Sequence, residues 1–443
     1  MPFEALTVDQ HPPSIKPGLS RKIAVIGAGI SGMGAAYMLS DDHDVTLFEA
    51  EPRLGGHART VMAGKAGDQP VDTGFIVFNY ANYPHMAALF AELDVPVVKS
   101  NMSFGASIGG GKLEYALTSL DALFAQRINA VNPRFLGMVR DIFRFNKNAL
   151  RVASQNPTLT VREFLAQLGA GDWFRDFYLL PLSGAIWSTP TERIMDFPAY
   201  AMIQFFENHA LLNTTGQHQW YTVEGGSTQY VQRLEARMVA RGVTLRLGCP
   251  VQSVTRDAGK VQIKAWGADA ETFDEVIFAT HSDDSLRLLG DPSAQEQSAL
   301  GAIAYQPNDI VLHADTSIMP RKRQTWASWV YTEDSTVKSE RIDLTYWMNS
   351  LQPIPMDDLH FVTLNSKRTI REELIYDQVT LRHPVYDLAA LAAQERLRAF
   401  NGAQNTWFCG AWMKNGFHED GLSSAVDVVD AIQGTNVLSV AAE

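Results

Sequence analysis

The sequence has very little cysteine. Cys249 and Cys409 are the only two in 443 residues, and they form neither a CxxC pair nor a metal-ligand spacing. Two isolated thiols argue against a disulfide framework, a dithiol redox mechanism and a structural zinc site. We therefore predict no metal site in this chain.

Long apolar runs and excess positive charge are also missing. The absence of a membrane-spanning run, and of a basic region followed by an apolar core at the amino terminus, predicts a cytoplasmic protein. The formal net charge of −12 argues against nucleic acid as a partner. One basic cluster, residues 321–323, precedes Trp326 and Trp329. It is typical of a solvated loop, or else of peripheral contact with a membrane surface or an acidic partner.

The most informative feature is a glycine-rich motif near the amino terminus. The apolar run 23–26 is followed by Gly27, Gly29 and Gly32, and a second apolar run ends at Glu49. This order predicts a buried strand, a turn that lets the backbone approach a pyrophosphate, and a helix whose amides face that anion. Glu49, twenty residues after Gly29, is placed to accept hydrogen bonds from a ribose. A nucleotide-free crossover is the alternative, because glycines also mark ordinary tight turns.

A second glycine turn favours FAD over NAD. Arg53, Gly55 and Gly56 follow Glu49 closely. This spacing is typical of two-domain flavoproteins, in which a second glycine loop approaches the cofactor, whereas NAD domains have no general need for it.

The patterns along the chain predict an α/β protein with a discontinuous Rossmann-type FAD-binding domain. We expect a flexible leader over 1–20 and the FAD-binding domain in 21–80, 220–285 and 402–437. The substrate domain occupies 81–219 and 286–401, with a helical insertion from about residue 117 and a mixed or antiparallel sheet from the alternating segments of 310–364. A second helix follows the glycine turn at Gly416, and its positive end would favour a reduced flavin.

Several sequence blocks in order resemble one superfamily. They are DTGFIVFN (72–79), IWS (186–188), FFENH (205–209), WYTVEGGS (220–227), RHPVY (382–386) and GFHEDGL (416–422). The chain resembles the flavin-containing amine oxidase and phytoene desaturase superfamily over nearly all of its length after residue 20. Within it, the chain is most similar to bacterial NAD/FAD-binding proteins associated with cyclopropane-fatty-acid synthase, and to the flavoprotein region of the plant synthases.

The resemblance implies a set of FAD-binding residues. Those implied to line the pyrophosphate are Gly27, Gly29, Ser31 and Gly32, with Glu49 on the adenosine ribose. Those implied to approach the phosphates or the flavin edge are Arg53, Gly55, Gly56 and His57, followed along the chain by Thr73 and Gly74. Those implied to meet adenine, or the ribityl and pyrimidine side, are Val251, Gly410, Gly421 and Leu422. The family commonly has arginine where this chain has His57.

The same resemblance implies flavin chemistry on a lipid. The expected function is FAD-dependent desaturation or double-bond isomerisation of a fatty-acyl chain, with hydride transfer to the flavin. The candidate catalytic residues are His418, His383, Tyr386 and His209, although each could equally be a structural residue. The helical insertion could wall an acyl channel or simply pack a core.

Two alternatives stay open at this point. One is a flavin amine oxidase that uses dioxygen, although we locate no lysine of the kind that such oxidases place near the flavin, and only Trp412 and Tyr386 could form an aromatic cage. The other is a flavin-bound scaffold that docks beside a cyclopropane-fatty-acid-synthase-like enzyme.

Overall fold

The computed structural model describes residues 20–187, 191–213, 216–333 and 341–434. The predicted leader over 1–20 therefore lies outside the described residues except for its last position, as does the end of the predicted segment 402–437.

A five-stranded parallel sheet forms the centre of one half of the molecule. Its strand order is β10-β2-β1-β14-β20, and every neighbouring pair is parallel. The strands are β1 (Lys22–Ile26), β2 (Asp44–Phe48), β10 (Thr244–Arg246), β14 (Glu275–Phe278) and β20 (Thr406–Phe408). The central strands β1 and β14 are short apolar runs because both of their faces are covered. Segments far apart in the sequence thus meet in one sheet, as the discontinuous fold predicted.

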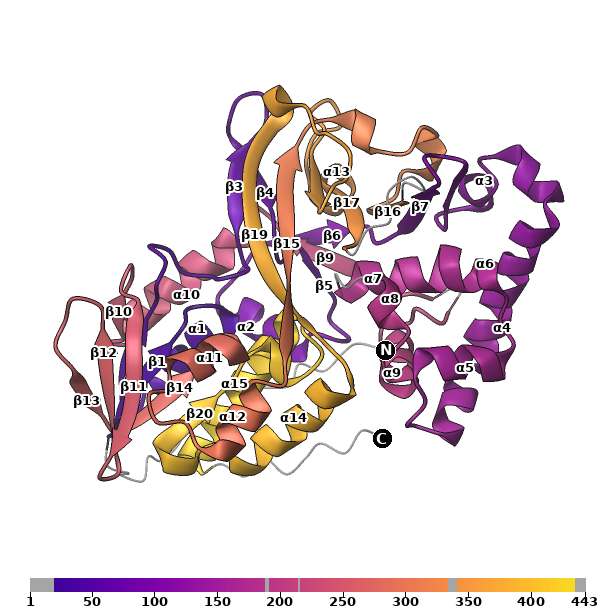
Figure 1. Cartoon of the computed structure of the whole chain (residues 1–443). Helices are drawn as coiled ribbons and strands as arrows, with labels where there is room; N and C mark the ends of the chain where they lie inside the picture. Colours follow the sequence, from indigo (N-terminus) through magenta and orange to yellow (C-terminus); the bar gives the residue numbers. More distant parts are fainter. Residues whose placement is uncertain (1–19, 188–190, 214–215, 334–340, 435–443) are drawn as a thin grey trace, which may run out of the picture.

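Helices cover one face of this sheet, and helices with a small sheet cover the other (Figure 1). The first face carries α1 (Ile30–Leu39), α2 (Pro84–Glu92), α10 (Thr228–Ala240) and α15 (His418–Gln433). The second carries α11 (Ser282–Leu288), α12 (Ala294–Leu300), α14 (Leu388–Phe400) and an antiparallel sheet of β11 (Val251–Asp257), β12 (Lys260–Ala265) and β13 (Glu271–Phe273). Both covers bury apolar sheet residues, which makes this half a doubly wound Rossmann-type unit.

The second half is built on a seven-stranded mixed sheet. Its order is β19-β15-β18-β17-β16-β7-β8, and only the β16–β7 pair is parallel. The strands are β7 (Phe104–Ile108), β8 (Leu113–Ala116), β15 (Ala304–His313), β16 (Trp329–Glu333), β17 (Asp343–Trp347), β18 (Phe361–Leu364) and β19 (Ile375–Val385). The long pair β15 and β19 runs down from this sheet toward the parallel-sheet half (Figure 1).

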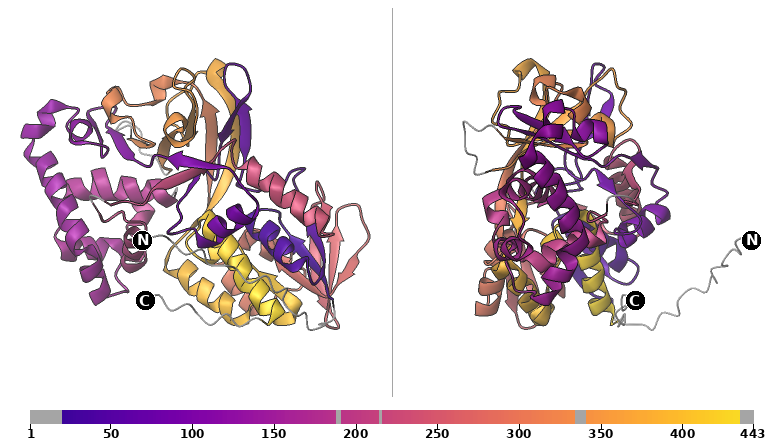
Figure 2. Two further views of the ribbon diagram at one scale, coloured as in Figure 1. Left: turned by 180° about the vertical axis from the view of Figure 1, so that it is seen from behind. Right: turned by 90° about the vertical axis from the view of Figure 1, so that its right-hand side faces the viewer.

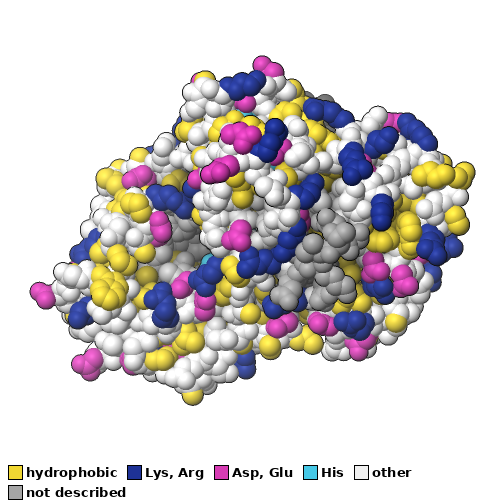
Figure 3. All heavy atoms as spheres, turned by 45° about the horizontal axis from the view of Figure 1, so that its top comes forward, with side chains coloured by type: hydrophobic (Ala, Val, Ile, Leu, Met, Phe, Trp, Pro, Cys, Tyr) yellow, Lys and Arg dark blue, Asp and Glu magenta, His cyan; other side chains and the backbone are white. Residues whose placement is uncertain are grey.

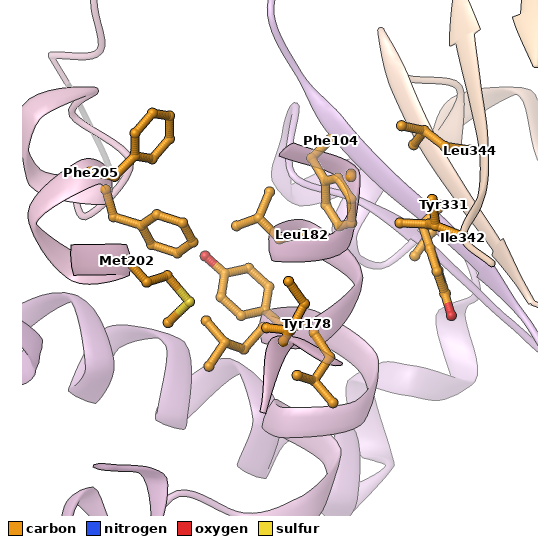
Figure 4. Packing of buried hydrophobic residues seen from close by; sticks show 14 of the residues in the cluster. Phe104, Tyr178, Leu182, Met202, Phe205, Tyr331, Ile342 and Leu344 are labelled. Atoms are coloured by element: carbon orange, nitrogen blue, oxygen red, sulfur yellow. The ribbon is translucent and has the colours of Figure 1, made fainter. Parts of the chain in front are cut away.

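The helical insertion lies beside this sheet and projects away from the rest of the molecule (Figures 1 and 2). Its elements are α3 (Leu120–Leu123), the 3-10 turn η1 (Arg127–Val131), α4 (Pro133–Gln155), α5 (Val161–Leu168), α6 (Asp172–Phe174), the π-turn η2 (Arg175–Leu179), α7 (Leu180–Trp187), α8 (Thr191–Ile194) and α9 (Ala199–Asn208). A capping box formed by Thr160 and Glu163 starts α5. The helical insertion shares one apolar core with the mixed sheet. Figure 4 shows Tyr178 and Leu182 between Phe205 of α9 and Phe104 of β7.

Short elements complete the chain. They are β3 (Thr60–Ala63) with β4 (Gln69–Asp72), the sheet of β5 (Val77–Phe78), β9 (Trp220–Val223) and β6 (Val97–Ser100), the helix α13 (Met348–Leu351), and the 3-10 turns η3 (Thr316–Ile318), η4 (Arg323–Thr325), η5 (Glu372–Leu374), η6 (Ala403–Asn405) and η7 (Ala411–Met413). Within the described residues, no helix has both the length and the apolar content needed to cross a bilayer.

The domain division at 286–401 stays a prediction. Within that segment, α12 and α14 pack against the second face of the parallel sheet, through residues such as Leu300 and Leu397. Their apolar stripes cover the sheet face that α1, α2, α10 and α15 leave open. A division drawn by packing would therefore assign these two helices to the FAD-binding half.

Candidate functional site

One cavity of about 1840 Å³ runs between the two halves. It passes the carboxyl ends of β1, β2 and β14, where parallel sheets place their ligands. It then continues between the mixed sheet and the helical insertion. Single small-molecule sites commonly occupy about 300–1000 Å³, so this volume can hold a dinucleotide and a second molecule.

Two glycine turns form a cradle at the first end of the cavity. The amide of Gly55 donates to the carbonyl of Ala28 at 2.8 Å, and Gly29 and Gly55 form an isolated parallel bridge. A Cβ on Gly56 would lie 3.0 Å from the Cα of Gly29, so the two loops approach as closely as backbones can. No side chain caps the first turn of α1, whose Gly29, Ile30 and Ser31 line the cavity. Those amides remain available to a phosphate.

Glu49 and Arg53 lie beside this cradle. Glu49 lines the cavity just after β2, and its carboxylate accepts hydrogen bonds from the amides of Ala28 at 2.6 Å and Glu51 at 2.9 Å. Arg53 donates to the carbonyl of Gly56 at 3.0 Å, so it holds the second glycine turn in shape while it lines the wall. The geometry therefore fits a dinucleotide whose pyrophosphate lies over the glycine turns.

Most of the predicted site residues line this one cavity. Those of the cofactor set are Gly27, Gly29, Ser31, Glu49, Arg53, Gly56, His57, Gly74, Val251 and Gly410, and those of the catalytic set are His209, His383, Tyr386 and His418. Five predicted cofactor residues are absent from the wall: Gly32, Gly55, Thr73, Gly421 and Leu422.

Gly55 belongs to the second glycine turn described above, and packing or hydrogen bonding accounts for the positions of the other four residues. A Cβ on Gly32 would lie 1.8 Å from the Gly27 carbonyl oxygen, so Gly32 lets α1 start directly against the turn. Thr73 is turned away from the cavity and accepts a hydrogen bond from Arg59 at 3.2 Å. Gly421 and Leu422 lie where α15 crosses α1, and a methyl of Leu422 fills the space left by Gly34. These residues shape the elements around the cradle.

His383 has a defined tautomer. The Asn365 amide is oriented by backbone, because its oxygen accepts from the Asp309 amide at 2.9 Å and its nitrogen donates to the Ile342 carbonyl at 3.0 Å. The same nitrogen donates to Asn308 Oδ1 at 2.8 Å, which turns Asn308 Nδ2 toward His383 Nδ1 at 2.8 Å. An amide NH₂ only donates, so His383 Nδ1 accepts and Nε2 carries the proton.

His209 has the opposite tautomer. Its Nδ1 lies 2.9 Å from the carbonyl oxygen of Phe205, which can only accept, so Nδ1 carries the proton and Nε2 is an acceptor. The ring stacks on Phe205, with centroids 3.9 Å apart. Burial lowers the pKa of His209 to about 4 and that of His383 to about 3. Both rings are therefore neutral at neutral pH, one offering a donor and the other an acceptor.

His418 and Tyr386 also have hydrogen-bond partners within the protein. His418, the first residue of α15, stacks on Phe75 with centroids 4.1 Å apart, and its Nε2 lies 2.6 Å from the hydroxyl of Tyr230. Burial lowers the pKa of His418 to about 3. The Tyr386 hydroxyl donates to the carbonyl of Ala411 at 3.4 Å. The hydroxyl proton of Tyr386 is thus engaged by the carbonyl of Ala411, in the segment before α15.

The sequence reasoning missed His281. This residue follows β14, and its ring stacks on Tyr305 with centroids 4.4 Å apart. The His57 ring lies between it and His383, at 5.8 Å and 5.5 Å respectively. Burial lowers the pKa of His57, and that of His281 to about 3, so these rings form a group of neutral imidazoles. The position of His281, just past a predicted parallel strand, was a usable signal.

The far part of the cavity, which we call the apolar arm, is lined by residues of 101–220 together with Trp329 and Tyr346. No described wall residue in 101–220 is Asp, Glu, Lys or Arg. Aromatic and aliphatic side chains make most of its surface, among them Phe104, Tyr178, Leu182, Ile186, Trp187, Phe205, Leu211 and Trp220. No lysine is present on the described wall of the whole cavity. The arm is therefore suited to an uncharged, apolar ligand.

Comparison with known proteins places the chain in a family. The family model for flavin containing amine oxidoreductases matches residues 30–341, and the chain belongs to this family. Its cofactor is FAD, and it is an FAD-dependent oxidoreductase of the amine oxidase-like superfamily. The residues that hold the cofactor stay a prediction. The α/β fold predicted from the sequence is confirmed by its similarity to solved structures.

Relatives similar to this chain have different named activities. Hydroxyneurosporene desaturase from Rubrivivax gelatinosus is 25% identical over 312 residues, which cover 64% of this chain and 58% of that protein. Coproporphyrinogen III oxidase from Mycobacterium tuberculosis is 46% identical over 77 residues, 16% of each chain. The chain thus matches less than two thirds of the length of either relative. The structure of a CLA-producing fatty acid isomerase from P. acnes has a TM-score of 0.67 at 15% identity, covering 96% of this chain and all of the other.

Proposed function

We propose that this enzyme acts on a lipid or fatty-acyl chain, by desaturation or by double-bond isomerisation. The observation that carries the proposal is the charge-free apolar arm, which opens from the glycine cradle within one cavity. An acyl chain loses no hydrogen bonds on entering such a space, whereas a protonated amine would lose its hydration with no carboxylate to replace it. The printed names of a desaturase and a fatty acid isomerase among the similar proteins support the same substrate class.

The chain's own residues have separable tasks in this proposal. The arm excludes water and holds an extended hydrocarbon against the aromatic rings of residues such as Phe205 and Trp220. The Nε2–H of His383 can donate to a polar substituent, while Nε2 of His209 can accept a proton from substrate. Bound FAD supplies the redox chemistry, accepting a hydride from carbon and, for isomerisation, returning it. Desaturation then needs an electron acceptor to reoxidise the enzyme, whereas isomerisation consumes none.

The test is an anaerobic mixing experiment with the purified holoenzyme. Unsaturated fatty acids and phospholipids that carry unsaturated or methyl-branched chains are added, and the visible flavin spectrum is followed while the products are analysed by mass spectrometry. For desaturation we expect lasting bleaching together with a new double bond. For isomerisation we expect a displaced double bond with a flavin that is reduced only transiently, because the hydride is returned to the substrate. Oxidised flavin in the presence of every lipid, together with peroxide release from amines in air, would replace the proposal with an amine oxidase.

A matched pair of variants tests the role of the arm. Ile186→Glu places a carboxylate on the wall of the arm, and Val239→Glu places one on the exposed face of α10. We expect Ile186→Glu to keep its FAD and to lose about tenfold or more in the rate of reduction by lipid, because a charge in the arm repels hydrocarbon. Val239→Glu should behave as wild type. Equal rates in the two variants would remove the arm from substrate binding.

Association with a cyclopropane-fatty-acid-synthase-like enzyme stays a prediction from the sequence resemblance. Co-expression with such a synthase, followed by gel filtration of the pair, would test it directly.

A further inference from the structure

The exposed apolar side chains of this protein gather around one mouth of the cavity. Among the described residues, six of the large hydrophobic side chains that are exposed lie between residues 117 and 143, and the others are scattered over the rest of the chain. The six are Leu117, Leu120, Ile128, Val131, Leu136 and Phe143, with exposed fractions of 40%, 77%, 70%, 73%, 43% and 58%. We call this surface of α3, η1 and the start of α4, with the neighbouring turn η4, the mouth face. A cluster of this kind marks an interaction site.

The mouth face has the opposite charge to the rest of the protein. Residues 117–155 contain six basic and two acidic residues, in a chain whose net charge is −12. Of the two acids, Asp121 pairs with Arg127 at 2.5 Å, and Asp141 is buried and paired with Arg140 at 3.1 Å. Packing of α3 against η4 brings in the basic cluster of residues 321–323. In Figure 3, Lys and Arg side chains lie among hydrophobic ones, with a few Asp and Glu side chains, on the right-hand lobe, where α3 and α4 lie in Figure 1.

The cavity opens within this face. Leu117, Leu120 and Phe143 line the cavity and are also exposed, so the apolar arm reaches the surface between α3 and α4. Along α4, Leu136 and Phe143 share one side of the helix with the exposed basic residues Arg140, Arg144, Lys147 and Arg151, opposite the buried stripe. Apolar side chains set among basic ones are what a helix lying in the interface of an anionic bilayer needs.

We propose that the mouth face docks on the surface of an anionic phospholipid bilayer. Leu120, Ile128 and Val131 enter the acyl boundary, while the basic side chains around them meet lipid phosphates. The opening of the apolar arm then faces the hydrocarbon, so an acyl chain enters without crossing water. Docking itself does not depend on the chemistry of the site, and only the delivery of a chain rests on the proposed function.

Sedimentation of the holoenzyme with vesicles tests the docking. The vesicles are phosphatidylcholine with or without phosphatidylglycerol. We expect binding to the anionic vesicles that weakens as salt is added. The apolar variant Ile128→Ser, Val131→Ser, Leu136→Ser should bind about tenfold more weakly, and each charge removed in Arg134→Gln and Lys147→Gln should cost about fivefold. None of these five residues lines the cavity, so FAD content and turnover of detergent-dispersed substrate should be unchanged.

The control is Met62→Ser, Val239→Ser, Met356→Ser, which removes similarly exposed side chains elsewhere and should bind as wild type. Equal binding of this control and the apolar variant, or no binding of wild type to anionic vesicles, would overturn the proposal. So would a change from dimer to monomer in the apolar variant without lipid, because the face would then cover a second copy of the chain. Vesicle binding is measured without turnover, so a failure of docking is distinct from a failure of the proposed function.

Discussion

Gly74 offers a sharp test of how the cradle is built. A Cβ at this position would lie 1.9 Å from the carbonyl oxygen of His57, where ordinary contacts begin at 3.4 Å. The same oxygen accepts a hydrogen bond from the Phe75 amide at 3.0 Å. In Gly74→Ala the two backbones must therefore separate by about 1.5 Å, which breaks that bond and displaces His57 and Phe75 from the cavity wall.

The expected cost follows from these two effects. Overpacking costs about 1–3 kcal/mol, and losing one backbone hydrogen bond costs about 1 kcal/mol more, so we expect about 2–4 kcal/mol in total. Because Phe75 stacks on His418, the displacement also reaches the start of α15. The variant should melt at a lower temperature and should retain less FAD, as measured by flavin absorbance relative to protein.

A glycine in α4 provides the matched control. A Cβ on Gly137 would meet nothing within 4 Å, and this residue lies inside the helix. Gly137→Ala should therefore stabilise the protein by about 0.5–1 kcal/mol and leave FAD content unchanged. The same substitution is thus expected to have opposite signs at two positions. A wild-type melting temperature and full FAD content in Gly74→Ala would refute the reasoning.

Three further predictions concern Glu49, Asn308 and His313. Glu49→Ala should weaken FAD retention by on the order of 1–3 kcal/mol in a titration of apoprotein, and full retention would show that this carboxylate does not hold the ribose. Asn308→Ala should free the His383 ring and slow flavin reduction by lipid with FAD content unchanged, and an unaltered rate would exclude His383 Nε2–H as a needed donor. The pKa of buried His313 is lowered to about 4, so its stabilising effect is complete above the unfolded value of 6.5 and is lost as pH falls toward 4. Between pH 7.5 and 5, wild type should lose about 2 kcal/mol more stability than His313→Gln in denaturant titrations, and parallel losses would contradict the buried neutral state.

The sequence signals that predict the cofactor site are local. Gly27, Gly29 and Glu49 follow short apolar runs, and such runs with such turns form parallel strands whose ends meet at one edge. The second turn at Gly55 and Gly56 has the same property, since its conformation depends on a few neighbouring residues. Five predicted residues, such as Gly421 and Leu422, do not line the cavity, and their roles stay a prediction. A sequence motif indicates which residue type a position needs. Whether that residue reaches the cavity wall depends on which side of α15 packs against α1.

The sequence by itself thus determined the Rossmann-type half, its cofactor class and the existence of a helical insertion, because each depends on periodicity and turn chemistry within about thirty residues. Only the tertiary structure decided that His57, His281 and His383 form one group, that Asn365 sets the tautomer of His383, and that the charge-free arm opens beside Leu120 and Phe143. These features join residues tens to hundreds of positions apart. They exist only where strands and helices from separate segments pack together, and no local pattern records that packing.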